Sequence, residues 1–449
     1  MGVVVVPKTG QTGLAFPVGQ PPPNPFFVFS PAHDPVTKSQ AQPVDVRYGH
    51  ECQLALSVDS DRLVARREPP DQLDSLDQSI RDALAAPLDF PPLAQAVIPG
   101  DHVVIALDTD TPAADTILAA IWDVLSARDV DPGDVLVLQP RCTGPGQPND
   151  PRSELPVDIR DQVRWQIHDP DQTEGGHYLA TSSSGERVYL AAELIEADLV
   201  IPVGPVVFDS VLGYRGTHSV LYPGLSNSES IARAVGRGHR ELDPNDQRPL
   251  RQLIDDVGWL LGVQFCVQVV PAGATGVAGV WAGLSESVFR EARESLEAAW
   301  RVEIDERSDI VVASIESDGG GHGWEQVGRA LEMARNLVTR EGRILLLTDL
   351  DETPGDGLKL LQNADAPTEA LSPLKSLAPS DLVSATQCVE ATDWARVYLL
   401  SQLDNDLVED LFITPLENPD EVDRLLSQPG QCLIVENAQH AYGRVRVVE

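Results

Sequence analysis

The stretch VVIALDTDTPAADTILAAIWDVLSAR, residues 103–128, decides the fold class of this chain. Its first five residues, Val103–Leu107, form a continuous apolar run, which is typical of a strand buried on both faces of a sheet. From about residue 112 to residue 128, apolar side chains such as Ile117 and Ile121 recur at helical spacing. A buried strand followed at once by an amphipathic helix predicts a βαβ unit.

The same alternation continues along the chain and predicts the α/β class, with two α/β domains whose mostly parallel sheets flank an interdomain cleft. Ligands of such folds bind outside the carboxyl ends of the strands. The predicted helices cover residues 112–128, 191–196, 285–300, 324–340 and 419–426. The predicted strands are Val103–Leu107, Val135–Leu138, Val163–Ile167, Leu199–Val203, Phe265–Val270, Ile310–Ser314, Ile344–Leu347, Val397–Leu400 and Cys432–Glu436.

We expect the chain to consist of an N-terminal arm followed by two domains. Residues 1–44 are rich in proline and lack a periodic apolar pattern, so they predict an extended or disordered arm, with a short strand at Val3–Val6. Residues 45–280 and 281–449 are the two predicted domains. The boundary is placed there because Pro271–Gly276 interrupts the pattern.

Charge excludes several functions. The chain has 449 residues, with 69 acidic and 33 basic side chains and a formal net charge of −36. Such a surface repels phosphate backbones and anionic lipids, so we expect neither a nucleic-acid partner nor a membrane partner. The same composition fits a salt-adapted surface. Only four of the basic residues are lysines, namely Lys8, Lys38, Lys359 and Lys375.

The five cysteines are dispersed and form no Cys-x-x-Cys pair, which argues against a disulfide framework and a zinc site. No apolar stretch approaches the length of a membrane span or a secretory signal. We therefore expect a cytoplasmic protein of unknown oligomeric state.

Two segments are candidate sites. Asp108–Pro112 lies where a strand meets a helix, and it is either an ordinary helix N-cap or a metal or substrate site. The loop Gly213–Gly224 combines glycines with Arg215, His218 and several hydroxyls. Such a loop can bring backbone amides and an imidazole against a ligand, although it can also be a surface loop.

Two further segments are also candidates. The glycine-rich turn Asp318–Gly323 precedes a helix that carries Gln326 and Arg329 on one face, so it is either an anion site or a flexible connection. It lacks the phosphate-loop pattern of a nucleotide-binding protein. His168-Asp169 follows a strand and is either structural or catalytic.

The order of these segments resembles the lactate racemase family of nickel-pincer 2-hydroxyacid racemases and epimerases. The resemblance extends from about residue 44 to residue 449 and is clearest at 103–112, 213–224, 262–270 and 324–350. It implies two α/β domains around a cleft. It also implies a pyridine-derived cofactor that is joined to a lysine by a thioamide. This cofactor would bind nickel, and a histidine would be a further ligand of the metal. Two further histidines would exchange the proton on opposite faces of the substrate.

The residues that carry this chemistry are replaced here. The family's lysine falls on His218, or on Ser219 without a gap, and no lysine lies between residues 39 and 358. The family's substrate-binding arginine falls on Thr111. Its two catalytic histidines fall near Cys142 and Asp209, and its metal-binding histidine falls near Val235.

An imidazole cannot form the thioamide link that an amine forms, so we do not expect the covalent nickel-pincer cofactor, and any other cofactor is unknown.

Three hypotheses about function follow. The chain binds a small anionic 2-hydroxyacid without the covalent cofactor; or it is an active racemase, epimerase or other metal-dependent isomerase with an altered attachment; or it is a non-catalytic partner of an active paralogue. The candidate catalytic residues are Asp108, Asp209 and His218. The candidate ligand-binding residues are Arg215, Gln326, Arg329 and Thr111, and His218 is the candidate metal ligand.

Overall fold

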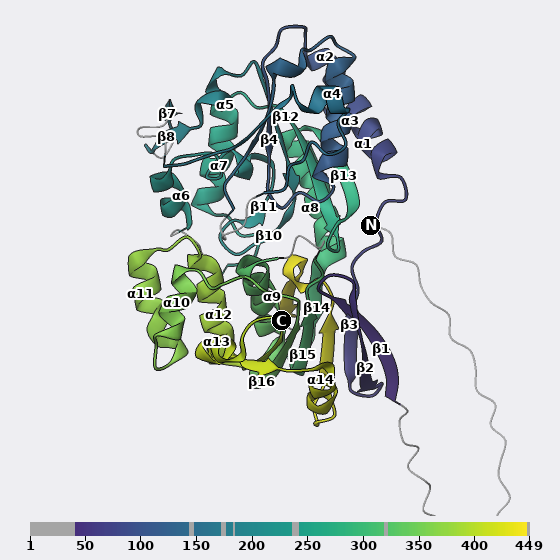
Figure 1. The fold of residues 1–449 in the computed structure, drawn as a ribbon, viewed down its shortest axis with the longest axis vertical. Coiled ribbons are helices and arrows are strands. Elements are labelled where there is room, and N and C mark those ends of the chain that lie inside the picture. Colours follow the sequence, from purple (N-terminus) through teal and green to yellow (C-terminus); the bar gives the residue numbers. More distant parts are fainter. Residues whose placement is uncertain are drawn as a thin grey trace, which may run out of the picture. The chain divides into compact units, whose positions relative to one another are not determined.

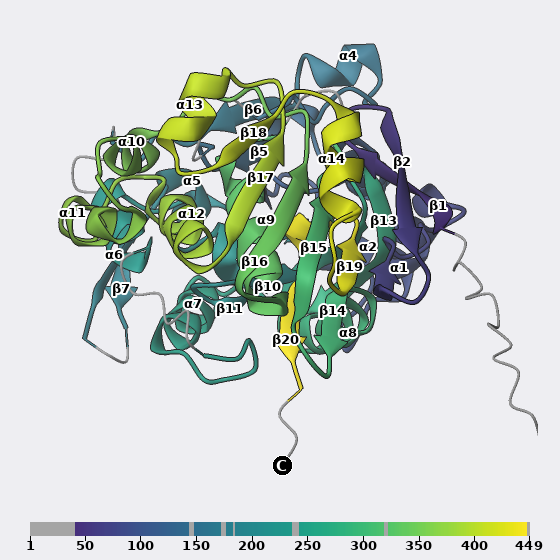
Figure 2. The same cartoon turned by 90° about the horizontal axis from the view of Figure 1, so that it is seen from below.

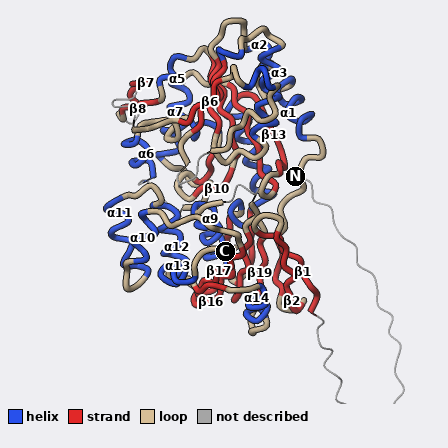
Figure 3. The backbone as a smooth tube through the Cα atoms, viewed as in Figure 1, coloured by secondary structure: helices blue, strands red, loops and turns tan. Residues whose placement is uncertain are grey.

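A computed structural model describes residues 41–142, 148–171, 177–182, 185–235, 242–317 and 322–446. The predicted arm and its strand at Val3–Val6 lie almost wholly outside these ranges. Its last residues belong to strand β1 (Ala41–Tyr48), which pairs antiparallel with β2 (Cys52–Asp59). Residues Gln40–Glu449 form one compact unit. Within this unit the strands form two separate groups, with helices beside each (Figure 3).

The first sheet has six strands, which are parallel except for the antiparallel edge strand β13. This is the mixed sheet expected of an α/β protein. In spatial order the strands are β13 (Gly276–Leu284), β12 (Phe265–Ala272), β9 (Leu199–Pro205), β4 (Val103–Leu107), β5 (Val135–Gln139) and β6 (Arg164–Ile167).

Helices cover both faces of this sheet (Figure 1). Alternate residues of β4 face opposite sides, because side chains of a strand alternate with a period of two. Ile105 packs with α1 (Leu76–Ala85) and α3 (Ala114–Ser126), whereas Val104 packs with α5 (Ala192–Glu196) and α7 (Pro249–Leu260). Burial on both faces explains why these strands are continuous apolar runs.

The second sheet is wholly parallel, and Figure 2 shows its strands side by side. Its last strand, β3, comes from the N-terminal region and pairs with β19. In spatial order the strands are β18 (Thr414–Leu416), β17 (Arg396–Leu400), β16 (Val338–Leu347), β15 (Ser308–Ser314), β19 (Cys432–Val435) and β3 (Leu63–Arg67).

One face of the second sheet packs against α9 (Trp324–Leu337) and α12 (Leu382–Trp394) in the largest apolar cluster. The other face packs against the β1–β2 hairpin and α14 (Pro419–Leu426). Helix α8 (Ser285–Trp300) follows the first sheet in sequence and contributes Leu296 and Trp300 to the cluster on α9. The two sheets are thereby joined through a shared core.

The remaining elements are short. The strands are β7 (His177–Thr181), β8 (Arg187–Leu190), β10 (Val207–Asp209), β11 (Gly213–Arg215), β14 (Arg301–Ile304) and β20 (Tyr442–Val445). The α-helices are α2 (Leu93–Ala96), α4 (Val157–Arg160), α6 (Ser228–Val235), α10 (Asp356–Gln362), α11 (Leu371–Leu377) and α13 (Asn405–Asp410). The 3-10 helices are η1 (Pro132–Asp134), η2 (Thr217–Val220), η3 (Pro367–Ala370) and η4 (Ala438–His440).

The predicted α/β class is confirmed, and all nine predicted strands are present. Two details differ. The turn within Pro271–Gly276 joins β12 to β13 as a hairpin, with Gly273 at a φ of +86° that favours glycine. The predicted helix over 324–340 ends at Leu337, because Val338 begins β16. Strand β3 lies in the second sheet, although its residues fall within the predicted 45–280 domain. The domain boundary near residue 280 stays a prediction.

No helix among the described residues is long and apolar enough to cross a membrane. The cytoplasmic location stays a prediction.

Candidate functional site

The carboxylate of Asp110 lies between two arginines that come from different parts of the fold. Its Oδ2 accepts a hydrogen bond from Arg215 Nη2 at 2.6 Å and lies 3.4 Å from Arg329 Nη2. Arg215 ends β11, beside the first sheet, whereas Arg329 lies on α9, which covers the second sheet. The Asp110 carboxylate therefore ties together elements associated with the two sheets.

The turn that carries Asp110 is anchored to the first sheet. The backbone N–H of Asp108 donates to the Val203 carbonyl of β9 at 2.8 Å, and Asp110 N–H donates to Asp108 Oδ1 at 3.1 Å. Thr111 Oγ1 donates to the Asp108 carbonyl at 2.6 Å. None of these side chains caps α3, whose N-cap is Ala113 in the left-handed region. The ordinary N-cap alternative is therefore wrong for this turn.

The two aspartates of the turn differ in their ionisation. Burial alone would raise the pKa of Asp110, but the charges and hydrogen bonds of Arg215 and Arg329 outweigh it and hold this pKa well below its usual value. Burial raises the pKa of Asp108, which lies 3.9 Å from Arg215 Nη1. Only Asp110 is thus firmly anionic.

Glu325 completes the cluster and was missed by the sequence prediction. It forms a close ion pair with Arg329, one helical turn away on α9. Burial opposes the charge of Arg329, yet Glu325 and Asp110 raise the pKa of its guanidinium. The two arginines therefore face the carboxylates of Asp110 and Glu325 and a third, that of Asp108, whose charge burial disfavours.

Gln326 and Asp209 serve the local backbone. Gln326 Oε1 accepts from the Gly323 N–H at 3.0 Å, at the start of α9. Asp209 Oδ1 accepts from the backbone N–H groups of Val211 and Leu212 at 2.8 and 2.7 Å, which closes the β10–β11 hairpin. Neither contact involves the two arginines.

His218 is buried in a different environment. Its Nε2 is 3.0 Å from Ser285 Oγ, its Nδ1 is 3.7 Å from Asp255 Oδ1, and Gly258 of α7 packs against its ring. None of these polar contacts is to Asp110 or Arg215. The structure therefore brings Arg215, Arg329, Asp108 and Thr111 together but gives His218 other partners.

The glycine-rich turn and His168 have structural contacts. Residues 318–321 of the glycine-rich turn lie outside the described residues, and His322 next to them lies 3.3 Å from Asp349 and contacts Thr348. His168 is buried, and its Nε2 donates to the Ser226 carbonyl at 2.8 Å. Within the described ranges, no group of three or more histidine, cysteine or acidic side chains is arranged to hold a metal ion.

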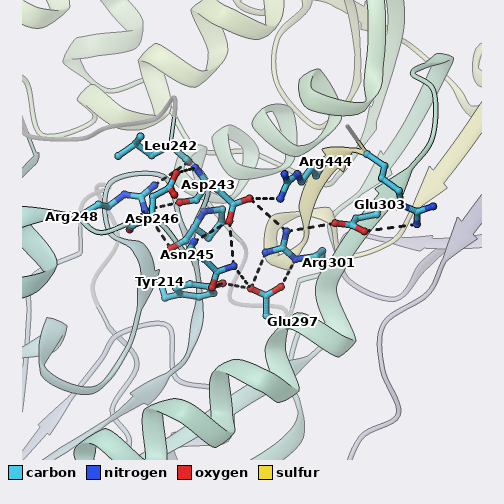
Figure 4. Close-up of polar contacts among 12 residues, drawn as sticks. Tyr214, Leu242, Asp243, Asn245, Asp246, Arg248, Glu297, Arg301, Glu303 and Arg444 are labelled. Atoms are coloured by element: carbon cyan, nitrogen blue, oxygen red, sulfur yellow. Dashed lines mark hydrogen bonds and ion pairs between the residues drawn. The ribbon is translucent and has the colours of Figure 1, made fainter. Parts of the chain in front are cut away.

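A cavity of about 580 Å³ lies beside this cluster, with Asp209 and Arg329 in its wall. Part of the wall belongs to the polar network of Figure 4, in which Asp243 lies between Arg301 of β14 and Arg444 of β20. This network holds the segment before α7 against the short strands near the second sheet.

A known family model matches in the N-terminal half. Residues 48–239 match the model of the lactate racemase N-terminal domain. Over these residues the chain is similar to lactate racemases.

Two solved structures share its fold. The lactate racemase apoprotein from Thermoanaerobacterium thermosaccharolyticum superposes with a TM-score of 0.75 and 16% identity, over 90% of this chain and all of that one. A protein from Thermotoga maritima superposes with a TM-score of 0.64 and 12% identity, over 84% of this chain and all of that one. No curated protein matches the chain.

The lactate-racemase-like fold does not bring a suitable anchor for the family's covalent cofactor. At the expected position, His218 is packed between α7 and Ser285, and an imidazole offers no amine for a thioamide. Lys359 and Lys375 are exposed on α10 and α11, outside the arginine cluster. The described residues thus do not fit this cofactor.

His440 is a second neighbour of the cluster that the sequence did not reveal. It ends η4, and its ring lies 5.2 Å from that of Trp300. Burial and the nearby charge of Arg329 lower its pKa to about 4, so this imidazole is neutral at pH 7. Only the fold brings it close to Arg329, more than a hundred residues earlier in the chain.

Proposed function

We propose that the chain binds a small anion of the 2-hydroxyacid type at the Arg215–Arg329 pair, and that it does so without a covalent nickel-pincer cofactor. The observation that carries this proposal is the position of Asp110. One carboxylate already contacts both guanidinium groups, so the pair has the spacing and chemistry to hold a ligand carboxylate.

The two contacts to Asp110 are unequal, which suggests how a ligand enters. Arg215 donates to Asp110 at 2.6 Å, whereas Arg329 lies 3.4 Å from it. A ligand carboxylate would displace the longer contact first and leave Asp110 on Arg215. Gln326, one turn before Arg329, uses its Oε1 on Gly323 and keeps its amide N–H groups for a ligand hydroxyl.

Asp110 then acts as an internal competitor of the ligand. Because it neutralises the same guanidinium groups, ligand binding has to overcome its attraction to them. Removing its charge in Asp110→Asn is expected to strengthen binding of a hydroxyacid, whereas weakening either arginine is expected to weaken it.

Calorimetric titration with D-lactate and L-lactate tests the proposal. We expect binding by the unmodified chain that weakens by about tenfold or more in Arg215→Lys and Arg329→Lys, which keep the charge but lose the forked donors. The surface variant Arg81→Gln, whose arginine pairs with Asp77 on α1, is the matched control and should bind as the unmodified chain does. Absence of lactate binding, or equal binding in all variants, would overturn the proposal.

A further inference from the structure

The cavity beside the arginine cluster carries a charge opposite to that of the whole chain. It lies between β10, α9, β20 and the segment before α7. Two carboxylates, those of Asp209 and Glu332, contribute to its wall. Six arginines line it, namely Arg248, Arg307, Arg329, Arg335, Arg444 and Arg446. The arginines outnumber the carboxylates of this wall, which favours an anion over a cation in the cavity.

Four of these arginines are held by close contacts. Arg248 donates to four backbone carbonyls between Leu242 and Asp246, as Figure 4 shows in part. Three others have carboxylate partners: Asp110 for Arg329, Asp243 for Arg444 at 2.9 Å, and Asp305 for Arg446 at 2.8 Å. The positive charges of these four arginines are therefore largely balanced by carboxylates or by backbone carbonyls.

Arg307 and Arg335 are different. Arg307 donates through Nη1 to the carbonyls of Arg335 and Val338 at 2.9 and 3.1 Å, and no carboxylate of the described residues pairs with it. Arg335 lies 3.5 Å from Asn336 Oδ1 and 3.8 Å from Glu390, while its Nε is buried without a hydrogen-bond partner. These two side chains keep donors for a ligand.

The two guanidinium groups share one aromatic ring, that of Trp394, at 5.0 and 5.7 Å from its centroid. Stacking on the indole favours each cation, but the two like charges oppose each other. Burial and the charge of Arg335 lower the pKa of Arg307 below its usual value. An anion between them would relieve this repulsion.

We propose that this cavity is a second binding site, in which Arg307 and Arg335 hold the phosphate group of a small organic phosphate. A phosphate monoester carries nearly two negative charges and three acceptor oxygens at neutral pH, so one group matches two guanidinium forks. A monocarboxylate would neutralise only one of them. The volume of about 580 Å³ exceeds that of free phosphate and lies within the range of small-molecule sites.

The two arginines proposed to hold the phosphate are different from the two proposed to hold the hydroxyacid. Neither Arg307 nor Arg335 contacts Asp110 or Arg215 in the described structure, although Arg329 borders both sites. Pyrophosphate binding can therefore be absent while lactate binding is present, and lactate binding can be absent while pyrophosphate binding is present. The two proposals can thus fail separately.

Titration of the full chain with pyrophosphate and with inorganic phosphate, followed by calorimetry, tests the second site. We expect pyrophosphate to bind and its Kd to rise about tenfold or more in Arg307→Gln and in Arg335→Gln. The matched control is Arg340→Gln. Arg340 also lies over Trp394, at 5.3 Å, and pairs weakly with Asp393, but it does not line the cavity. Its removal should leave the Kd within about twofold.

A second variant keeps the test decisive if either glutamine variant fails to fold. Asn336→Asp has nearly the same shape and places a carboxylate beside Arg335, so it should abolish pyrophosphate binding without removing a cation. Three results would overturn the proposal: no binding by the unmodified chain at millimolar pyrophosphate, unchanged binding in Asn336→Asp, or an equal loss in Arg340→Gln.

Discussion

At the scale of single residues, the balance of charge around Asp110 governs the site. Two buried guanidinium groups reach this carboxylate, and each has few other acidic partners: Asp108 for Arg215 and Glu325 for Arg329. Burying a charge is costly unless it is paired, so the cluster depends on Asp110 staying ionised.

Asp110→Asn is expected to destabilise the fold by about 3 kcal/mol at pH 7, because it leaves two buried cations without their shared anion. The control is Asp77→Asn, which breaks an exposed pair with Arg81 and should cost less than about 0.5 kcal/mol. Urea denaturation measures both. The pKa of folded Asp110 lies below its unfolded value of about 3.9, so this contribution is present above pH 4 and fades as the pH falls further. Equal stability of the two variants at pH 7 would contradict this account.

His440 gives the protein a second pH dependence. Its folded pKa of about 4 lies below the unfolded value of about 6.5, so the unfolded state takes up the proton first as the pH falls. Stability should therefore decline by about 2.5 kcal/mol between pH 6.5 and pH 4 on account of this residue. In His440→Asn the decline should be smaller by that amount, as followed by chemical denaturation across this range. Parallel pH profiles for the two proteins would show that His440 does not titrate in this way.

Sequence reasoning could find part of the site at this scale. Asp108, Thr111, Arg215 and Arg329 were predicted from their positions next to strand ends and glycine-rich segments, and they do meet. Glu325 could have been found, since it lies four residues before Arg329 on a predicted helix. No local pattern could place His440 beside Arg329, or turn His218 toward Ser285, because both depend on how distant elements pack.

At the scale of elements, the burial of a strand on one or both faces determines how clearly its sequence pattern predicts it. The central strands, such as β4 and β15, are covered on both faces and therefore appear as apolar runs. The β1–β2 hairpin was missed although Leu54, Leu56 and Val58 alternate with exposed residues, which is the pattern of a strand with one exposed face, and short β3 is mixed in character. Strand β3 precedes the first sheet in the sequence, so the order of the chain does not indicate that β3 belongs to the second sheet.

The packing of α7 against η2 gives a test at this scale. A Cβ on Gly258 would come within 2.3 Å of the His218 ring, so Gly258→Ala should destabilise the fold by about 1–3 kcal/mol although alanine favours helices. In a His218→Ala background the clash is gone, and the same change should be neutral or stabilising by up to about 1 kcal/mol. Thermal and urea denaturation of the four proteins give this cycle. Additive effects of the two substitutions would mean that the helix and the ring do not meet as described.

At the scale of the whole molecule, a lactate-racemase-like fold is combined with a surface of net charge −36 and almost no lysine. The scarcity of lysine extends through residues 39–358, which contain the loop that anchors the family's cofactor. In this fold Arg215 and Arg329, which come from elements beside the two different sheets, converge on Asp110.

The central claim is that this fold works without the covalent nickel-pincer group, and intact-mass spectrometry tests it most directly. The full chain would be produced together with cofactor-biosynthesis proteins, and a His218→Lys variant would show whether a restored amine can be modified at this position. We predict that the unmodified chain has the mass of its amino-acid sequence alone. A covalent adduct of the cofactor's mass on the natural sequence would contradict the account.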